Sequence, residues 1–378
     1  MFKMKKIAHI DINAFFAQAE VLRNPSLKGK PIAIGNDSRR SVLSTASYEA
    51  RKFHVNSAMP IAQAKILCPN LIIIPGDYHY YFQLSHSLMH YLKKRFGGIE
   101  QVSVDECYID LTDYLTEGHE AEDLFDIQMD IFKAVKLKVS IGLGSNKFLA
   151  KMGSDYKKPL GITVFTKENL PEILWPISIE KMYGIGKKTA PKLIENGIAT
   201  IGDLAKCQNP QIRKILGNLF EYFQGQANGF GDDVINTSAF DPKSISAERT
   251  FPVDALTYEE ISAMIESCCH EIHKELSYYN KEANVVFIKL RTPDFKTKSK
   301  QKSLPFPIHT EKDIIASIMD LFDHFYQGEP LRLIGVGLSK VAPRKDNEEK
   351  QSEIKNLNSM LNLGGKVFLG SDLKGNKK

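Results

Sequence analysis

The chain has 378 residues, 43% of them hydrophobic and 25% charged, and a formal net charge of +5 at pH 7, values typical of a soluble globular protein of about two to four domains. Its five cysteines form no C-x-x-C pair, so we expect neither a disulfide framework nor a thiolate zinc site, and a cytoplasmic location fits best. No long apolar run occurs, and His9 and Asp11 interrupt the apolar stretch near the N-terminus, so we predict neither a membrane span nor a signal-peptide core.

The first 75 residues alternate short apolar runs with turns. Residues 5–12 read as a strand that ends near Asp11, and residues 13–22 follow a helical pattern. Between residues 24 and 75, the runs PIAIG, SVLSTA and LIIIP and a polar helix over 48–52 are separated by Pro and Gly. We interpret this segment as a small inserted subdomain.

Longer elements follow. Apolar spacing predicts a helix over 78–96, a hairpin around Asp105, a helix over 121–135, and a strand over 137–144 that leads into a helix at Asn146. The order strand, helix, hairpin, helix, strand is typical of an α+β fold with helices on one face of an antiparallel sheet.

The second half of the chain changes character twice. Residues 170–230 predict a compact helical module, and the polar stretch 231–248 is the best linker candidate. Beyond it we predict a helix over 258–279, strands over 284–292 and 295–304, a helix over 311–327 and a last strand over 332–341. From Arg344 onward the sequence is rich in Lys, Asn and Glu, which predicts disorder.

Two acidic segments, Asp11 in HIDINAFF and Asp105-Glu106 in SVDECYID, predict a divalent-metal site. Three carboxylates within ~4 Å of one another repel by roughly 4 kcal/mol per pair at an effective dielectric near 20, so such a cluster needs cations. Oxygen ligands favour Mg²⁺ or Mn²⁺ over zinc. Adjacent strand residues point to opposite faces, so Asp105 and Glu106 can share a metal only if the chain bends, as at a hairpin tip.

The stretch YGIGKKT has the form of a helix-hairpin-helix turn, in which Gly184 and Gly186 let backbone amides approach a phosphate. A plain interhelical turn is the alternative. A Walker A loop fails because Lys188 stands where Ser or Thr is needed, and GLGSNK fails as a dinucleotide fingerprint because Lys147 replaces its third Gly.

In FKTKSKQKS, Lys296, Lys298, Lys300 and Lys302 recur with period two, so a strand would place all four ammonium groups on one face, as a rail for a phosphate backbone. A charged edge strand that discourages aggregation is the alternative. Lys289 and Arg291 on the preceding strand favour nucleic acid. Neutralising the four lysines should then reduce the log-log salt slope of DNA binding by about 3 to 4.

Three other patterns are weaker. Cys269 and His273 have metal-ligand spacing, but no second ligand pair accompanies them, so a buried helix face is the better interpretation. Asp110 and Asp113 read as surface or capping residues rather than ligands. Tyr48 and Arg51 share one side of a short helix and suit either a triphosphate clamp or a plain surface helix.

Six segments occur in the order found in Y-family DNA polymerases: IDINAFFAQAE, NPSLKGKP, STASYEARKF, SVDECYID, NKFLAKMGSDYKKPLGI and GIGKKTAPKL. The resemblance is closest to the DinB, or DNA polymerase IV, branch and covers roughly residues 5–342. It implies an α+β multidomain right-hand polymerase: a palm of antiparallel sheet plus helices (1–19 and 77–166), small fingers (20–76), a helical thumb with the helix-hairpin-helix (167–233), a linker (234–244), an α+β little finger (245–342) and a disordered tail (343–378).

The resemblance also implies residue roles. Asp11, Asp105 and Glu106, with the Ile12 carbonyl, would hold two Mg²⁺ ions, for which Mn²⁺ could substitute. Phe16 would be the steric gate that excludes a ribose 2′-hydroxyl. The dNTP-binding set would be Phe15, Phe16, Thr45, Tyr48, Arg51 and Lys158, and the DNA-binding set would be Gly184, Gly186, Lys187, Lys289, Arg291, Lys296, Lys298, Lys300, Lys302 and Arg332.

The implied activity is template-directed, low-fidelity DNA synthesis across lesions, without proofreading, by a monomer that binds primer-template DNA and dNTPs. Two metals would activate the primer 3′-hydroxyl and stabilise the pyrophosphate leaving group. A nucleotidyl cyclase could use a similar palm but would not need the helix-hairpin-helix or the lysine strand. A DNA-binding scaffold without catalysis is disfavoured by the intact acidic trio.

Some positions depart from the family pattern. Asn13 stands where many relatives have a second Asp, which argues against a ligand role there, and Gly337 stands where some have a basic DNA contact. The sliding clamp is a candidate partner, although Gln351 to Ile354 match its binding peptide poorly.

Overall fold

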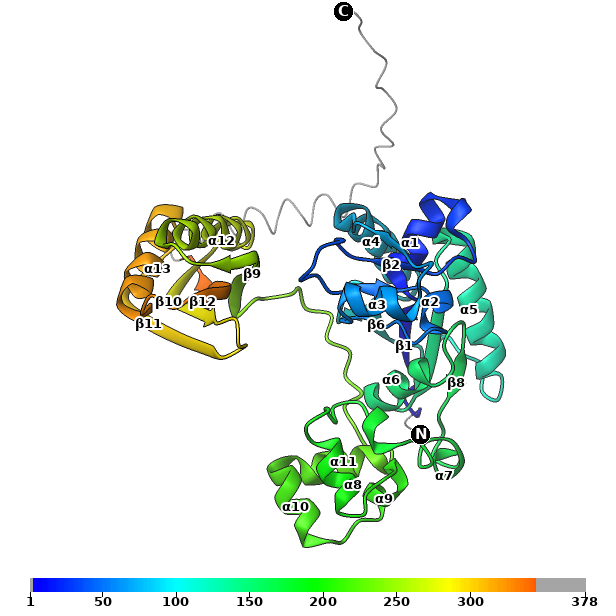
Figure 1. Cartoon of the computed structure of the whole chain (residues 1–378). Helices are drawn as coiled ribbons and strands as arrows, with labels where there is room; N and C mark the ends of the chain where they lie inside the picture. The colour runs from blue at the N-terminus through cyan, green and yellow to red at the C-terminus, as the bar shows by residue number, and fades with distance from the viewer. Residues whose placement is uncertain (1–2, 345–378) are drawn as a thin grey trace, which may run out of the picture. The chain divides into compact units, whose positions relative to one another are not determined.

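The computed structural model describes residues 3–344, and the chain divides into two compact units, Met1–Ala239 and Phe240–Lys378 (Figure 1). Nearly all of the predicted tail, including Gln351 to Ile354, lies outside the described residues. In residues 3–344 no helix combines the length and apolarity that a bilayer crossing requires.

The first unit contains a five-stranded sheet with the strand order β5-β6-β1-β7-β8. Its strands are β1 (Ile7–Ile12), β5 (Ile99–Gln101), β6 (Glu106–Asp110), β7 (Val139–Gly144) and β8 (Ile162–Val164). Neighbouring strands are antiparallel, except for the parallel pair β7 and β8. Because β1 is the central strand and is buried throughout, Asp11 lies inside the sheet and not at its edge.

Helices cover both faces of this sheet: α1 (Phe15–Arg23), α4 (Tyr78–Phe96), α5 (Glu120–Val135) and α6 (Lys147–Tyr156). Ile10 on β1 belongs to the core that α4 and α5 complete, whereas Ile7 packs against Ala150 of α6. Alternate residues of a strand point to opposite faces, so Asp11 shares the α6 face with Ile7. The prediction of helices on one face was therefore wrong for α6.

The inserted segment forms a three-stranded sheet of order β3-β2-β4 with its own small core. Its elements are the short helix η1 (Pro25–Leu27), β2 (Ile32–Ile34), β3 (Thr45–Ala46), α2 (Tyr48–Arg51), α3 (Ile61–Leu67) and β4 (Ile72–Ile74). Ser47 caps α2 by accepting a hydrogen bond from the amide of Ala50, which begins the helix at Tyr48. The helix α3 was not predicted from the sequence.

Short helices make up the rest of the first unit, as predicted. They are α7 (Leu170–Ile173), η2 (Ile179–Lys181), α8 (Ala190–Glu195), α9 (Ile201–Ala205), α10 (Pro210–Leu216), η3 (Gly217–Leu219) and α11 (Phe220–Ala227). Their apolar side chains share a core with Phe148, Leu149 and Met152 of α6.

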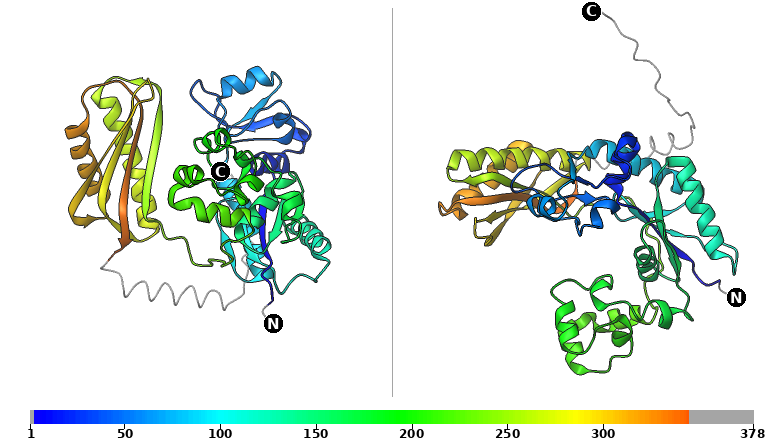
Figure 2. Two further views of the ribbon diagram at one scale, coloured as in Figure 1. Left: turned by 90° about the horizontal axis from the view of Figure 1, so that it is seen from below. Right: turned by 45° about the vertical axis from the view of Figure 1, so that its right-hand side comes forward.

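The second unit is a four-stranded antiparallel sheet of order β11-β10-β12-β9 with two helices. Its elements are β9 (Ser244–Ala255), α12 (Tyr258–Tyr278), β10 (Lys281–Arg291), β11 (Thr297–Ile308), α13 (Glu311–Phe325) and β12 (Leu331–Pro343). Both helices lie on the same side of the sheet and pack into one core with it (Figure 2). Within the described residues of this unit no helix covers the other face of the sheet, which is called the open face below.

Strand β9 was missed because its start lay inside the predicted linker. Ile245 and Ala247 point to the core, but Ser244, Ser246 and Glu248 alternate with them and make the segment read as polar. Exposed residues at 249 and 250 then break the alternation, and the register shifts between Leu331 and Leu333 on the partner strand.

An ion pair between a buried lysine and a half-exposed aspartate joins strand β10 of this sheet to the segment before β9. Asp241 pairs with Lys281, whose side chain is only 6% exposed, and with the exposed Lys243. Hydrogen bonds from Lys243 and Lys281 lower the pKa of Asp241 to about 2. Asp294 offers a matched comparison, since Lys296 and Thr292 lower its pKa to about 2 as well, but Lys296 is 82% exposed.

We expect Asp241→Asn to lower the melting temperature of the full chain at pH 7 more than Asp294→Asn does, because it leaves the buried Lys281 ammonium uncompensated. The pKa of Asp241 is lowered from an ordinary value of 3.8, so its contribution is present above about pH 4 and is lost as the pH falls toward 2. In calorimetry the difference between wild type and Asp241→Asn should shrink over that window. Equal losses for both variants at pH 7 would contradict this expectation.

Candidate active site

Two carboxylates meet in the middle of the five-stranded sheet. Asp11 on β1 lies directly opposite Glu106 on β6 in the antiparallel register, and opposite Ser140 on β7. Directly opposed residues of neighbouring strands point to the same face, so Asp11 and Glu106 lie side by side under α6. Strand register therefore brings together two acidic residues that are far apart in the sequence.

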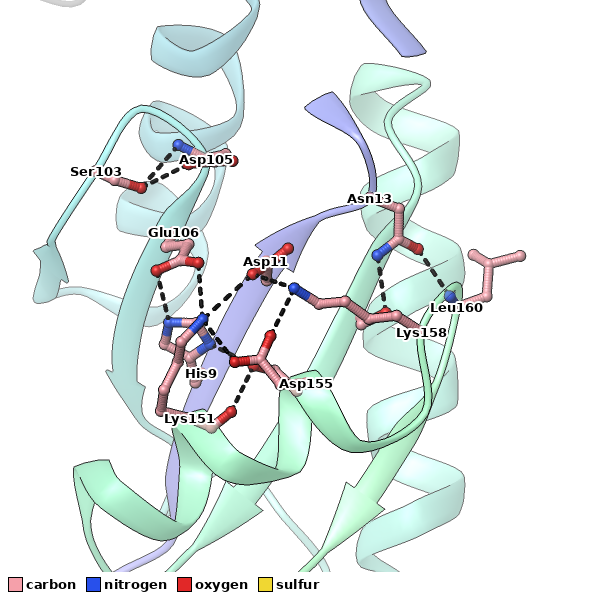
Figure 3. A network of polar contacts seen from close by, with 12 residues as sticks. His9, Asp11, Asn13, Ser103, Asp105, Glu106, Lys151, Asp155, Lys158 and Leu160 are labelled. Carbon is pink, nitrogen blue, oxygen red and sulfur yellow. Dashed lines mark hydrogen bonds and ion pairs between the residues drawn. The ribbon is translucent and has the colours of Figure 1, made fainter. Parts of the chain in front are cut away.

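Two lysines and a third carboxylate complete a charged network around this pair (Figure 3). Lys158 Nζ lies 2.6 Å from Asp11 Oδ2 and 2.7 Å from Asp155 Oδ1. Lys151 Nζ lies 2.8 Å from Glu106 Oε1, 3.1 Å from Asp155 Oδ2 and 3.5 Å from Asp11 Oδ2. Three acidic side chains face two ammonium groups, so the network has one more acidic group than basic groups, which suits a cation.

His9 supports this network from beneath. Its ring is fully buried, and Nδ1 lies 2.7 Å from Ser154 Oγ on α6. Nε2 lies 3.6 Å from Glu106 Oε2 and has no hydrogen-bond partner among the described residues. Burial lowers the pKa of His9, so the imidazole is neutral at physiological pH.

Asp105 stands apart from the other two predicted ligands. It belongs to the turn between β5 and β6, which is the predicted hairpin, and its Oδ1 accepts a hydrogen bond of 2.6 Å from Ser103 Oγ (Figure 3). In the part of the chain that the structure describes, no three His, Cys, Asp or Glu side chains are close enough to hold a metal ion together. Asp11, Asp105 and Glu106 do line one cavity, although the three carboxylates are not close enough to coordinate one metal ion together.

Burial makes the carboxylate pair respond to cations. It raises the pKa of Asp11 to about 7, and a hydrogen bond with Glu106 adds to the rise while Lys158 and Lys151 oppose it. Burial acts in the same direction on Glu106, but the nearby His9 ring and the hydrogen bonds with Asp11 and Lys151 hold the pKa of Glu106 below its usual range. A bound divalent cation would stabilise the ionised form of both residues.

The cavity has a volume of about 200 Å³ and extends from these carboxylates to the inserted subdomain. Tyr48 and Arg51, which begin and end α2, both line it, and the Arg51 guanidinium lies 4.8 Å from the centre of the Tyr48 ring. Tyr48 Oη is buried and has no hydrogen-bond partner among the described residues. Burial raises the pKa of Tyr48, which keeps this hydroxyl a donor.

The structure therefore brings all of the predicted metal-binding and dNTP-binding residues to one cavity: Asp11, Ile12, Phe15, Phe16, Thr45, Tyr48, Arg51, Asp105, Glu106 and Lys158. Sequence reasoning missed Lys151, Asp155 and His9. Lys151 and Asp155 are four residues apart on a predicted helix, and Lys158 follows three residues later, which is the one signal that could have indicated a shared charged face.

The helix-hairpin-helix turn lies between η2 and α8. Gly184 has φ +93°, and a Cβ there would meet the Phe223 ring at 2.8 Å, so this position requires glycine. A Cβ at Gly186 would meet nothing within 4 Å, which leaves the backbone there open to a ligand. Lys187 follows in the same turn and is exposed.

The lysine segment forms the predicted strand β11, but its lysines do not face the open side of the sheet. Lys298, Lys300 and Lys302 lie opposite Leu290, Ile288 and Val286, whose side chains belong to the core under the helices. Lys298 pairs with Glu329 at 3.1 Å, Lys302 with Asp320 at 2.5 Å and Lys296 with Asp294 at 2.8 Å. The expected rail is thus on the helix side, and three of its four members are ion-paired.

Lys289 and Arg291 point to the open face instead, because they alternate with those core residues along β10. Gly335 and Gly337 of β12 lie opposite Lys289 and Phe287. A Cβ at Gly337 would meet the Phe287 ring at 2.2 Å, so a larger side chain has no room there. Arg332 lies over the Phe295 ring at 4.4 Å.

The weaker patterns have structural roles. Cys269 is fully buried in the core, and His273 lies 3.7 Å from Glu311, so this pair does not form a metal site with the residues described. Asp110 pairs with Lys5 and accepts a hydrogen bond from the amide of Thr112, and Asp113 pairs with Lys3.

Models of protein families match three stretches of the chain. Residues 10–155 match the impB/mucB/samB family, residues 167–198 the IMS family HHH motif, and residues 242–354 the impB/mucB/samB family C-terminal domain. The first stretch contains the carboxylate pair, the second contains the helix-hairpin-helix turn, and the third covers most of the second unit.

Curated relatives and solved structures agree with this. The chain is 38% identical over 337 residues to DNA polymerase IV of Bacillus velezensis, covering 88% of this chain and 81% of the relative. It is 36% identical over 355 residues to DNA polymerase IV of Lactococcus lactis subsp. cremoris, covering 92% and 97%. A Y-family DNA polymerase chimera, Dbh-Dpo4(243-245)-Dbh, superposes with a TM-score of 0.78 at 27% identity, covering 90% of this chain and 100% of that chain.

The sheet, the helix-hairpin-helix and the paired carboxylates define a polymerase of the right-hand class, and the chain belongs to the Y family of DNA polymerases, the translesion class of DNA-directed DNA polymerases. Within that family it is a DinB-type member, like the DNA polymerase IV relatives. Members of the family depend on divalent metal ions.

Proposed function

We propose that this chain extends a DNA primer on a template strand with dNTPs and Mg²⁺, at low fidelity and without proofreading, in the tolerance of DNA damage. The observation that best supports this is the cavity that Asp11 and Glu106 line together with Tyr48, whose hydroxyl has no hydrogen-bond partner among the described residues. A triphosphate with its metal ions would satisfy both features, because the carboxylates would bind the metals and the tyrosine hydroxyl would donate a hydrogen bond to a phosphate oxygen.

The residues present fit two divalent ions. Asp11, Glu106 and Asp105 offer carboxylate oxygens around one cavity, with the Ile12 carbonyl as a further donor, and oxygen ligands favour Mg²⁺ with Mn²⁺ as a substitute. When bound, the metals would supply an acidified primer 3′-hydroxyl and charge neutralisation for the pyrophosphate. Lys151 and Lys158 hold the carboxylates in place until then.

The remaining cavity residues would bind and select the nucleotide. Arg51 and Lys158 are cations suited to phosphate oxygens, and Tyr48 donates through its free hydroxyl. Phe16 projects from the first turn of α1 into the same cavity, where its ring would exclude a 2′-hydroxyl. The protein thus positions the nucleotide and neutralises the charge of its phosphates, and these two effects supply most of the catalysis in phosphoryl transfer.

A primer-extension assay tests this function. The purified chain with Mg²⁺, primer-template and dNTPs should add the nucleotides that the template specifies, and should continue across a defined lesion such as an abasic site. Chelation of the metal should stop synthesis without releasing the DNA. A folded, DNA-bound protein that adds nothing in Mg²⁺ or Mn²⁺ would refute the proposal.

We also propose how the protein holds DNA. The helix-hairpin-helix turn would bind backbone phosphates through the open amides near Gly186, with Lys187 beside them. The open face of the second unit's sheet would contribute Lys289 and Arg291, with Arg332 nearby on β12. The paired lysines of β11 would contribute less than their number suggests, because their neighbours already neutralise them.

Salt dependence distinguishes the two faces of this sheet. We expect Lys289→Gln with Arg291→Gln to reduce the log-log salt slope of DNA binding by about 1, at about 0.9 per lost phosphate contact, because Lys289 is already paired with Glu248 at 2.7 Å and Arg291 supplies most of the effect. Lys298→Gln with Lys302→Gln should change it by less than half of that, since both lysines are ion-paired. Fluorescence anisotropy at several salt concentrations measures both slopes. A larger change in the variant with Lys298→Gln and Lys302→Gln would instead support the prediction from the sequence that the lysines of β11 contact the DNA backbone.

The domain boundaries proposed from the sequence need one revision. We propose a palm over 1–19 and 77–166, fingers over 20–76 and a thumb over 167–233, as expected. The little finger should begin near Ser244, where β9 starts, and not only after it. A monomeric state and a cytoplasmic location remain part of the proposal, and the five cysteines are free and buried, which suits a reducing compartment. The sliding clamp remains a candidate partner.

A further inference from the structure

The ring of Phe16, the proposed steric gate, packs against a second, buried aromatic ring. Phe16 stacks on Tyr81 of α4, with ring centroids 4.6 Å apart and planes 15° from parallel. Tyr78, also on α4, meets Phe16 edge to face at 5.6 Å, and Phe15 lies 5.3 Å away. Phe16 is half-buried and lines the cavity, whereas Tyr81 is 1% exposed and does not reach it. Tyr81 therefore packs against Phe16 without itself lining the cavity.

Tyr81 is held in place by a charged chain that joins α1 to α4. Its hydroxyl donates a hydrogen bond of 2.6 Å to Glu20 Oε1, and Glu20 is only 3% exposed. Arg23 Nη2 lies 2.8 Å from the same oxygen and 2.9 Å from Oε2, and Arg23 Nη1 lies 2.7 Å from Asp77 Oδ2. Asp77 in turn caps α4 by accepting a hydrogen bond from the amide of Tyr80.

Tyr81 connects this chain of hydrogen bonds to Phe16 directly. Phe16 and Glu20 are one helical turn apart on α1, and Tyr81 contacts both, one with its ring and the other with its hydroxyl. A steric gate rejects a larger substrate only to the extent that its ring cannot retreat. For Phe16 to retreat, Tyr81 must leave Glu20, which would cost the buried Tyr81 hydroxyl this hydrogen bond and leave Glu20 Oε1 with Arg23 alone.

We propose that Tyr81, fixed by Glu20, is a positioning residue that sets the depth of the sugar pocket and so determines how strongly ribonucleotides are rejected. The proposal rests on the proposed role of Phe16 as the gate. It assigns to Tyr81 and Glu20 a part in substrate selection that neither residue could exert by contact with the nucleotide, since neither lines the cavity.

The test is the ratio of kcat/KM for a dNTP to that for the matching rNTP, measured by single-nucleotide primer extension. Phe16→Ala should lower this ratio by about 100-fold or more, Tyr81→Ala by about tenfold, and Tyr81→Phe by a few fold, since it keeps the ring and loses only the hydroxyl. Tyr91→Phe is the matched control. It lies on the same helix, accepts a hydrogen bond from Arg95, and should leave the ratio unchanged.

A double variant separates positioning from general support. If Tyr81 acts through Phe16, adding Tyr81→Ala to Phe16→Ala should lower the ratio no further. The proposal is overturned if Tyr81→Ala and Tyr81→Phe slow dNTP and rNTP incorporation in equal proportion, or if the double variant shows two independent losses. Tyr81→Phe keeps the test valid should Tyr81→Ala fail to fold, as melting curves will report. An unchanged ratio in Phe16→Ala would instead refute the gate itself.

Discussion

Glu106→Gln is expected to reduce primer extension by a factor on the order of 10² to 10³, the loss typical of removing one preorganised electrostatic contact from a catalytic site. The amide keeps the size of the side chain and can still accept a hydrogen bond from Lys151, which lies 2.8 Å from Glu106 Oε1. It cannot supply the negative charge that the cations need beside Asp11. The loss should therefore appear in kcat, measured by single-turnover extension in Mg²⁺.

Asp110→Asn is the matched control, because Asp110 lies on the same strand but pairs with Lys5 at a distance from the cavity. It should leave extension within about twofold of wild type, as surface substitutions away from special features usually do. Asp105→Ala should reduce extension at least as strongly as Glu106→Gln does, while both variants still bind primer-template DNA. Full activity in either would refute the assignment of the metal ligands.

Gly142→Ala is expected to destabilise the first unit and to impair catalysis together. A Cβ at this position would lie 2.0 Å from the carbonyl oxygen of Ala150 and 2.2 Å from the amide nitrogen of Ser154, so the backbone of α6 must move away from β7. Overpacking of this kind costs about 1 to 3 kcal/mol and occasionally more. Because α6 carries Lys151 and Asp155, the shift would also spread the charged network.

Gly225→Ala is the control for this substitution. Gly225 lies within α11, and a Cβ there would meet only Phe230 at 3.9 Å, an ordinary contact. It should leave the melting temperature unchanged or raise it slightly, because alanine favours a helix over glycine. Calorimetry and primer extension on the same preparations measure both effects. A Gly142→Ala protein as stable and active as wild type would contradict the close contact of α6 with β7.

Local periodicity predicted most of the fold. The helix expected over 78–96 is α4, bounded as Tyr78–Phe96, because its apolar stripe is regular and Asp77 caps it. The sequence could not reveal that α6 packs on the second face of the sheet, since that depends on Gly142 and Gly153 allowing two backbones to touch. Strand β9 was missed for a similar reason. Its alternation of polar and apolar residues identifies a strand only once the segment is seen to pair with β12.

For the site, the sequence predicted which residues take part better than it predicted where they lie. Residue chemistry predicted the acidic trio, Tyr48 and Arg51, the family resemblance added Phe16 and Lys158, and all of them line one cavity. The lysine strand shows where such reasoning stops. Period two correctly placed Lys298, Lys300 and Lys302 on one face, but which face depends on pairing with Leu290, Ile288 and Val286, and that register is a tertiary property.

By itself, then, the sequence determined which chemical groups the protein carries, which of them lie one helical turn or two strand residues apart, and the family to which they belong. Only the tertiary structure decided that Asp11 faces Glu106, that Lys151 and Lys158 neutralise them, and that Tyr81 backs Phe16. The physical reason is that spacing along a chain is set by local backbone geometry, whereas strand register and helix packing are set by contacts between residues distant in sequence.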